Sequence, residues 1–185
     1  MRTTRLRVVT MVVRPALPDE AATLADLAAR TFPLACPPEL PREAIEEFIT
    51  EHLDVDAFRG YLNTDGYTVL ASVRADGEVC AYALLVDGAA MDPACAHLLA
   101  GDPTIGISKF YVDQSLHGSG AARILLDAVI DHGRLADARS LWLATNVGNS
   151  RARAFYTRSG FVERGTRVFT VGGLDNQDVV LELPL

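Results

Sequence analysis

The most informative segment of the sequence runs from Ile105 to Ala138 and reads IGISKFYVDQSLHGSGAARILLDAVIDHGRLADA. Its apolar start predicts a strand from Ile105 to Val112, and its end predicts a long helix to about Ala138, because apolar residues recur there at helical spacing. The turn His117-Gly118-Ser119-Gly120 lies between them. A glycine turn that joins a strand to a helix gathers backbone N–H groups and the positive end of a helix dipole at one point. This turn is therefore a candidate phosphate site.

The rest of the chain predicts an alternation of strands and helices around this stretch. Before it we expect a strand at Val8–Arg14, a helix opened by Pro18-Asp19-Glu20, a helix at Pro41–His52, a short stretch with Phe58, Tyr61 and Leu62, and strands at Tyr67–Val73 and Val79–Val86. Asp76-Gly77 between those two strands is typical of a tight hairpin. After it we expect a strand at Ser140–Thr145, a helix at Asn149–Ser159, and strands from Phe161 onward, the last at Val179–Leu183. This order predicts an α/β domain with one mixed, mostly antiparallel sheet and helices on both faces.

Length and composition indicate one globular domain. The 185 residues are 49% hydrophobic and 22% charged, which suffices for a single core. We expect residues 1–10 to be a flexible leader and 11–185 the domain. No apolar run approaches the roughly 18 residues of a membrane span, so we expect no membrane partner.

Cysteine and histidine usage argues against disulfides and metals. Cys36, Cys80 and Cys95 are odd in number and form no C-x-x-C pair, and the four histidines form no H-E-x-x-H motif. We expect a reducing, cytoplasmic location and no metal site.

Charge is distributed unevenly along the chain. The net charge of −7 excludes a general nucleic-acid binder. The segment from Pro15 to Pro103 has 16 acids against four arginines, whereas the other residues carry 8 acids against 13 bases. One end of the molecule should therefore attract cations and the other anions.

A second pattern follows at Asn149-x-x-Ala152-x-Ala154-Phe155-Tyr156. With Asn149 as N-cap and Gly160 beyond the C-terminus it predicts a short helix. Alone it fits an ordinary capped helix with a core aromatic equally well. The glycine turn likewise lacks the wider context of a Rossmann site or a P-loop.

In this order and spacing, the two patterns resemble the GCN5-related N-acetyltransferase (GNAT) superfamily. Its acetyl-CoA signature is Q/R-x-x-G-x-G/A followed by N-x-x-A-x-x-x-Y. The resemblance covers Val12 to Leu183, and His117 stands where the family usually has Gln or Arg.

The resemblance implies an acetyl-CoA-dependent N-acetyltransferase that works by direct attack of a primary amine. The pantetheine arm would pair with the main chain of Phe110, Tyr111 and Val112. The phosphates would lie on the turn and the start of the helix, and Asn149 would also contact the cofactor. The implied turn contacts are His117, Gly118, Ser119, Gly120, Ala121, Ala122 and Arg123. Tyr156 would protonate the departing thiolate, as a phenol at hydrogen-bonding distance can.

The general base is not evident from the residues. Many members of the family carry Glu in the strand before the turn, where this chain has Gly106. His97 or a water relay through Ser108 or an acidic helix residue are the alternatives. Lys109, the only lysine, is interpreted as a charge at a strand edge.

The acceptor is expected to be a small cationic amine. Phe155–Phe161 and the C-terminal segment resemble a branch that includes bacterial spermidine/spermine acetyltransferases, and the acidic half of the chain suits a polyamine. Its densest acids are Glu43, Glu46, Glu47, Glu51, Asp54 and Asp56. The alternatives are a non-catalytic acyl-CoA-binding module and an acetyltransferase for protein N-termini, lysines or an antibiotic amine. A homodimer is compatible with all of them.

Overall fold

The computed structural model describes residues 10–171 and 173–185. The predicted leader, apart from Thr10, and the start of the predicted strand at Val8 lie outside these residues. The strands are β1 (Met11–Pro15), β2 (Tyr67–Arg74), β3 (Val79–Asp87), β4 (Thr104–Val112), β5 (Ser140–Asn146), β6 (Val162–Val171) and β7 (Leu174–Pro184). The α-helices are α1 (Ala21–Thr31), α2 (Arg42–His52), α3 (Val55–Asn63), α4 (Ala121–Leu135) and α5 (Ser150–Arg158). Short 3-10 turns are η1 (Pro18–Glu20), η2 (Phe32–Ala35), η3 (Pro93–Leu98) and η4 (Gln114–Leu116).

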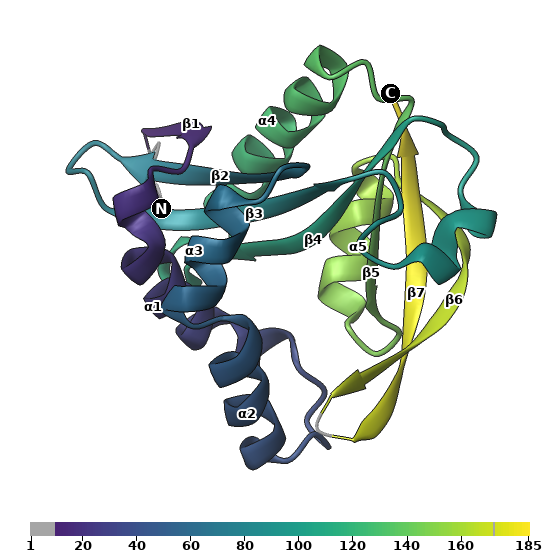
Figure 1. Cartoon of the computed structure of the whole chain (residues 1–185), viewed down its shortest axis with the longest axis horizontal. Helices are drawn as coiled ribbons and strands as arrows, with labels where there is room; N and C mark the ends of the chain where they lie inside the picture. The colour runs from purple at the N-terminus through teal and green to yellow at the C-terminus, as the bar shows by residue number, and fades with distance from the viewer. Residues whose placement is uncertain (1–9, 172) are drawn as a thin grey trace, which may run out of the picture.

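One seven-stranded sheet runs through the molecule in the order β1-β2-β3-β4-β5-β7-β6 (Figure 1). Every neighbouring pair is antiparallel except β4 and β5, which run parallel. The predicted fold class, a single α/β domain with a mostly antiparallel sheet, is confirmed.

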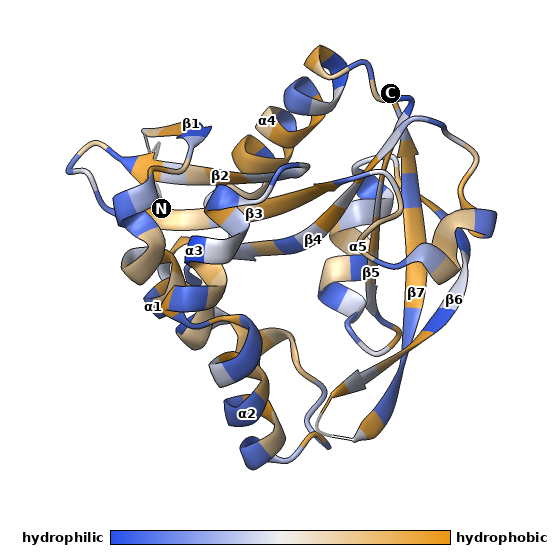
Figure 2. Cartoon of the chain, in the orientation of Figure 1, coloured by the Kyte–Doolittle hydropathy of each residue, from blue (hydrophilic) through white to orange (hydrophobic). Residues whose placement is uncertain are grey.

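Strand β3 has a hydrophobic core on each face. Ala83 and Leu85 pack into the core that lies under α4 and α5, and the alternate residues Tyr82 and Leu84 pack into the core under α1 and α3. Successive side chains of a strand point to opposite faces, so a strand buried on both faces must be apolar throughout. Figure 2 shows β3 as hydrophobic along most of its length, whereas α2 is largely hydrophilic.

Strands β4 and β5 pair only at their beginnings. Their register runs from Thr104 opposite Ser140 to Gly106 opposite Trp142, and beyond that point the two strands separate. The later half of each strand therefore has an edge without a ladder partner, and an opening is left in the middle of the sheet.

A β-bulge in β4 lies next to this opening. On the β3 side Leu85 pairs with Ile107 and Leu84 pairs with Lys109, so Ser108 is the extra residue. The bulge changes which face of the sheet the following side chains of β4 point to. Ile107 lies in the core under α4, whereas Tyr111, four residues later, packs in the core under α1 and α3. Lys109, two residues before Tyr111, shares its face.

Several local predictions differ from the structure, and the last strand, for example, begins at Leu174 rather than Val179. The loop predicted from Gly88 to Pro103 contains η3, which begins where the Asp92 side chain accepts a hydrogen bond from the Ala94 amide. Helix α4 ends at Leu135 rather than near Ala138, because Asp137 has φ of 56° and cannot continue a right-handed helix. Among the described residues, no helix is long and apolar enough to cross a membrane.

Candidate functional site

The glycine turn leaves backbone amides free at the start of α4. Gly118 and Gly120 have φ of 81° and 91°, and a Cβ atom on either would meet no atom within 4 Å. The amides of Gly118, Gly120 and Ala122 donate to no group of the described residues. Three free amides at a helix N-terminus suit a phosphate.

A cavity of about 440 Å³ lies against this turn. Its wall contains the predicted cofactor residues Phe110, Tyr111, Val112, His117, Gly118, Gly120, Ala121, Ala122, Arg123 and Asn149, together with Tyr156. Ser119 is the one predicted contact outside this wall, because its hydroxyl turns back to donate to the Leu116 carbonyl at 2.7 Å. The structure thus brings the two sequence patterns together around one space.

Among the residues that the structure describes, three arginines and no carboxylate line this cavity. They are Arg123, Arg151 and Arg158. Arg151 donates a hydrogen bond of 3.0 Å to Nδ1 of His117, so the histidine in place of the usual Gln or Arg holds an arginine at the turn. Sequence reasoning missed Arg151 and Arg158, although their spacing of seven residues puts them on one face of α5.

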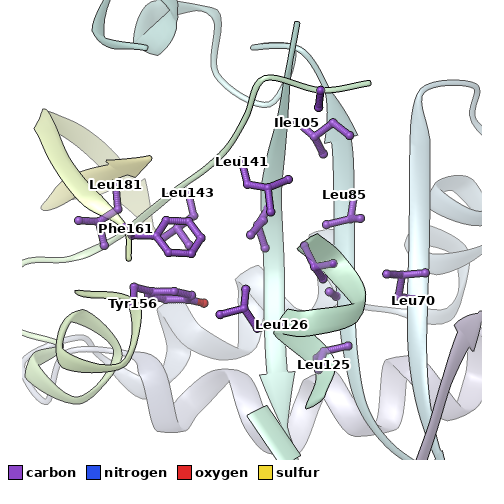
Figure 3. Packing of buried hydrophobic residues seen from close by; sticks show 14 of the residues in the cluster. Leu70, Leu85, Ile105, Leu125, Leu126, Leu141, Leu143, Tyr156, Phe161 and Leu181 are labelled. Atoms are coloured by element: carbon purple, nitrogen blue, oxygen red, sulfur yellow. The ribbon is translucent and has the colours of Figure 1, made fainter. Parts of the chain in front are cut away.

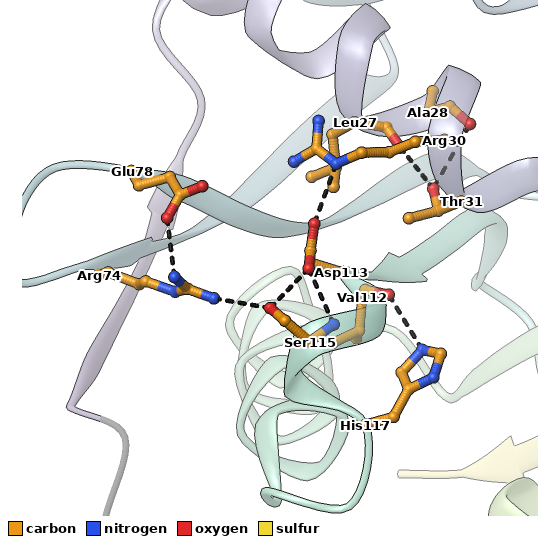
Figure 4. A network of polar contacts seen from close by, with 10 residues as sticks. All are labelled: Leu27, Ala28, Arg30, Thr31, Arg74, Glu78, Val112, Asp113, Ser115 and His117. Atoms are coloured by element: carbon orange, nitrogen blue, oxygen red, sulfur yellow. Dashed lines mark hydrogen bonds and ion pairs between the residues drawn. The ribbon is translucent and has the colours of Figure 1, made fainter.

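The turn is tied to the opposite face of the sheet by a polar network (Figure 4). Asp113 accepts hydrogen bonds from the Ser115 amide at 2.9 Å and hydroxyl at 2.6 Å. It also pairs with Nε of Arg30, on α1, at 2.9 Å. The hydrogen bond from the Ser115 hydroxyl, with further help from Arg30, lowers the pKa of Asp113 to about 2.

This network predicts a pH dependence of stability. A carboxylate with a lowered pKa stabilises the fold above its unfolded pKa of about 3.9, and this contribution is lost as pH falls through about 2. Asp113→Asn should therefore lower the free energy of unfolding by roughly 1 to 2 kcal/mol at pH 6, and the difference from wild type should shrink between pH 4 and 2. Urea denaturation at a series of pH values measures the free energy of unfolding and its dependence on pH. Asp56→Asn, at an exposed ion pair on α3, is the matched control and should change stability little. A pH-independent effect of Asp113→Asn would contradict the assignment.

Tyr156 is buried, but its hydroxyl has no hydrogen-bond partner in the described part of the chain. The residue is 6% exposed, and its ring packs edge-on against Phe155 and Phe161 with centroids 5.2 Å away. In Figure 3 the hydroxyl points away from Phe161, toward Leu126 of α4. It makes no hydrogen bond to any described residue, although Tyr156 lines the cavity. Burial raises the pKa of this phenol, which keeps it protonated.

A second cavity, of about 320 Å³, adjoins the first. Ala35, Tyr111 and Asn149 line both. Much of its remaining wall is aromatic: Phe32 stacks on Phe48 at 4.7 Å, and Phe48 meets Phe169 edge-on at 6.0 Å. The two cavities therefore meet at the open side of β4.

Asn149 joins the two cavities and caps α5. Its side-chain oxygen accepts a hydrogen bond of 3.1 Å from the Ala152 amide, as predicted for an N-cap. Its side-chain NH₂ group donates to none of the described residues and is available to a ligand.

The comparison with protein families agrees with this geometry. The model of the Acetyltransferase (GNAT) family matches residues 22–161. The chain belongs to this family. The matched region runs from α1 through α5 and includes the glycine turn, Asn149 and Tyr156. The predicted family is confirmed.

Relatives of this GNAT protein cover nearly its whole length. An uncharacterized N-acetyltransferase of Mycobacterium tuberculosis is 36% identical over 162 residues, which are 88% of this chain and 96% of the relative. The crystal structure of PaiA N-acetyltransferase from Thermoplasma acidophilum, in complex with coenzyme A, has a TM-score of 0.76 at 16% identity and covers 95% of this chain and 99% of that chain. The spermidine N-acetyltransferase SpeG from Vibrio cholerae has a TM-score of 0.66 at 14% identity, with 94% and 93% covered. The prediction of an N-acetyltransferase with acetyl-CoA as cosubstrate agrees with these findings.

Lys109 of the GNAT protein, interpreted from the sequence as a strand-edge charge, lies in the wall of the second cavity. It belongs to the half of β4 that has no ladder partner on the β5 side, and the bulge at Ser108 turns the lysine toward α3. Its Nζ lies 4.8 Å from the centroid of the Tyr61 ring. Burial lowers the pKa of Lys109 to about 8.

The candidates for a general base differ in their position relative to the two cavities. His97 is exposed on η3, with Nδ1 2.8 Å from the Ala94 carbonyl, and it lines neither cavity. Ser108 lines the second cavity. At Gly106 a Cβ atom would lie 3.1 Å from Nε1 of Trp142, so a side chain there would require its neighbours to move.

The acidic cluster lies outside the second cavity. Glu43, Glu46, Glu47, Glu51, Asp54 and Asp56 are all missing from its wall. Asp178 is its acidic residue, and it pairs with Arg167 at 3.4 Å.

Proposed function

We propose that this GNAT protein transfers the acetyl group of acetyl-CoA to a primary amine. The observation that carries the proposal is the meeting of the two cavities at Tyr111 and Asn149, beside the opening between β4 and β5. One cavity has the chemistry to hold an anionic cofactor, and the other has the size of a small-molecule site.

The residues around the first cavity fit coenzyme A. The free amides of Gly118, Gly120 and Ala122 would receive the pyrophosphate, with Arg123, Arg151 and Arg158 nearby for the remaining phosphate charge. The unpaired edge of Phe110 to Val112 would take the pantetheine arm as an added strand. Bound acetyl-CoA supplies a thioester, whose carbonyl carbon is the electrophile.

The proposed reaction needs three proton movements. The neutral amine nitrogen attacks the thioester carbonyl carbon, the C–N bond forms, and the C–S bond breaks with its electron pair on sulfur. The attacking nitrogen gives up a proton to water as the amide forms, and Tyr156 gives its proton to the thiolate and regains one from solvent. The acceptor, charged when it arrives, has lost its proton to water, with Ser108 as a candidate in the relay. The sum is an acetamide, CoA thiol and one proton released from the ammonium. Burial raises the pKa of Tyr156, so the phenol carries the proton that it gives to the thiolate.

A polyamine acceptor stays a prediction. The acidic half of the sequence and the likeness in fold to SpeG support it. The wall of the second cavity does not, because it holds Lys109 and Arg167 and a single carboxylate that is already paired. We also propose a cytoplasmic location, which the unpaired thiols of Cys36, Cys80 and Cys95 support.

Thiol release from acetyl-CoA, with and without a panel of primary amines, tests the proposal. We expect release that depends on the amine, with acetylated amine formed in equal amount. A non-catalytic acyl-CoA-binding module would bind CoA and give no release above hydrolysis with any amine, including peptide N-termini, lysine and aminoglycosides.

A further inference from the structure

We propose that the second cavity accepts an amine that has an apolar or aromatic body and also carries a carboxylate, and that Lys109 binds this carboxylate. The inference rests on the proposed acetyl transfer and names the acceptor class, amphipathic amino acids and related amino carboxylates.

The charged side chains of the cavity wall differ in whether they already have a partner. Arg167 is fully engaged: it pairs with Asp92 at 2.9 Å and with Asp178 at 3.4 Å. Lys109 has no carboxylate within ion-pair distance among residues 10–171 and 173–185. Among the described residues of the wall, Lys109 is therefore the cation without a carboxylate partner, whereas His52 lies 3.7 Å from Glu51 and the carboxylate of Asp178 is paired.

The position of Lys109 favours the binding of an anion. Lys109 is half-buried, and its Nζ rests over the Tyr61 ring at 4.8 Å, where it lacks most of the water that would stabilise its charge. A pKa lowered to about 8 by burial is the expected result, and at neutral pH the amine is still mostly protonated. A carboxylate brought by the ligand would restore the missing partner, and in such a place a charged pair is worth more than at the surface.

The rest of the wall determines the body of the acceptor. Phe32, Phe48 and Phe169 form a continuous aromatic side, which suits an apolar chain or ring. Tyr111 follows Lys109 on the same face of β4 and lines both cavities. An amino carboxylate can thus have its carboxylate at Lys109 and its amine toward the junction at Tyr111. A polyamine would instead bring more positive charge next to Lys109, which is repulsive.

Matched acceptors that differ only in the carboxylate test the proposal. L-Phenylalanine is compared with 2-phenylethylamine, and L-tryptophan with tryptamine, by thiol release and by the mass of the product. We expect wild-type kcat/KM to be at least about 10-fold higher for the amino acid of each pair, as a hydrogen bond to a charged group implies. In Lys109→Met this preference should fall toward one, and Lys109→Arg should keep part of it.

Arg59→Met provides the control, because Arg59 is an exposed cation on α3 outside both cavities and should leave the preference as it is. If Lys109→Met lowered kcat/KM by the same factor for both members of a pair, the inference would be overturned and a general-base role for Lys109 would be favoured. Acetylation of spermidine or of the plain amines, with neither amino acid accepted, would also overturn it and leave acetyl transfer standing. Absence of transfer to every amine, with CoA still bound, would overturn the proposed function itself.

Discussion

Replacing Tyr156 by Phe is expected to lower kcat for acetyl transfer by about 10² to 10⁴-fold, the usual contribution of a general acid. The ring packs edge-on against Phe155 and Phe161, and Phe preserves that packing. The hydroxyl makes no hydrogen bond within the described protein, so its loss leaves no partner unsatisfied. The affinity for CoA should stay within about two-fold, since only proton donation is removed.

Tyr82→Phe is the matched control for this substitution. Tyr82 is fully buried in the core under α1 and α3, its hydroxyl also lacks a partner, and it lines neither cavity. Its loss should leave kcat unchanged. Steady-state rates and CoA titrations of both variants check the expectation. Wild-type turnover in Tyr156→Phe would mean that Tyr156 is a core residue and that water protonates the thiolate.

Replacing Gly120 by Glu is expected to abolish the stabilisation by CoA. In the wild type, CoA at about 100 times its Kd should add roughly 2.7 kcal/mol, or about 5 to 10 °C in Tm for a domain of this size. A glutamate at Gly120 would fill the space in front of the free amides and put a carboxylate beside them. We expect the CoA-induced shift in Tm to disappear, as measured by thermal denaturation with and without CoA.

Gly77→Glu separates this effect from backbone strain. Gly77 also has a positive φ, of 89°, with open space around it, but it lies in the hairpin between β2 and β3. Both variants should lose about 1 to 2 kcal/mol of stability, because a side chain strains this backbone conformation. Only Gly120→Glu should lose the CoA-induced shift in Tm. An unchanged shift in Gly120→Glu would contradict the placement of the pyrophosphate at the turn.

The arrangement of strands and helices could be predicted because each element carries its own signal. Helix α4 follows a glycine turn and shows helical spacing, and the Asp76-Gly77 dipeptide marks the β2–β3 hairpin. The end of α4 could not be predicted, since it depends on the left-handed conformation of Asp137. The bulge at Ser108 also has no local signal, because it arises from how β4 fits β3.

That bulge accounts for the part of the candidate site that sequence reasoning missed. Without it, Lys109 would share the face of Ile107 and lie in the core under α4. The cofactor side was easier to predict, because Gly118, Gly120 and Asn149 act through the backbone or as a cap, which spacing reveals. The acceptor side is assembled from η2, α2, α3 and four strands, and no short pattern predicts such a wall. The charge count could not show that the acids of α2 lie outside it.

A crystal structure of the protein with CoA will show whether the thiol end of the cofactor reaches the junction of the two cavities. We predict the pyrophosphate at the amides of Gly118, Gly120 and Ala122, the pantetheine arm along Phe110 to Val112, and the sulfur within hydrogen-bonding distance of the Tyr156 hydroxyl. The sulfur should face the junction of the two cavities at Tyr111 and Asn149. CoA bound elsewhere, or a sulfur directed away from both Tyr156 and the second cavity, would contradict the account.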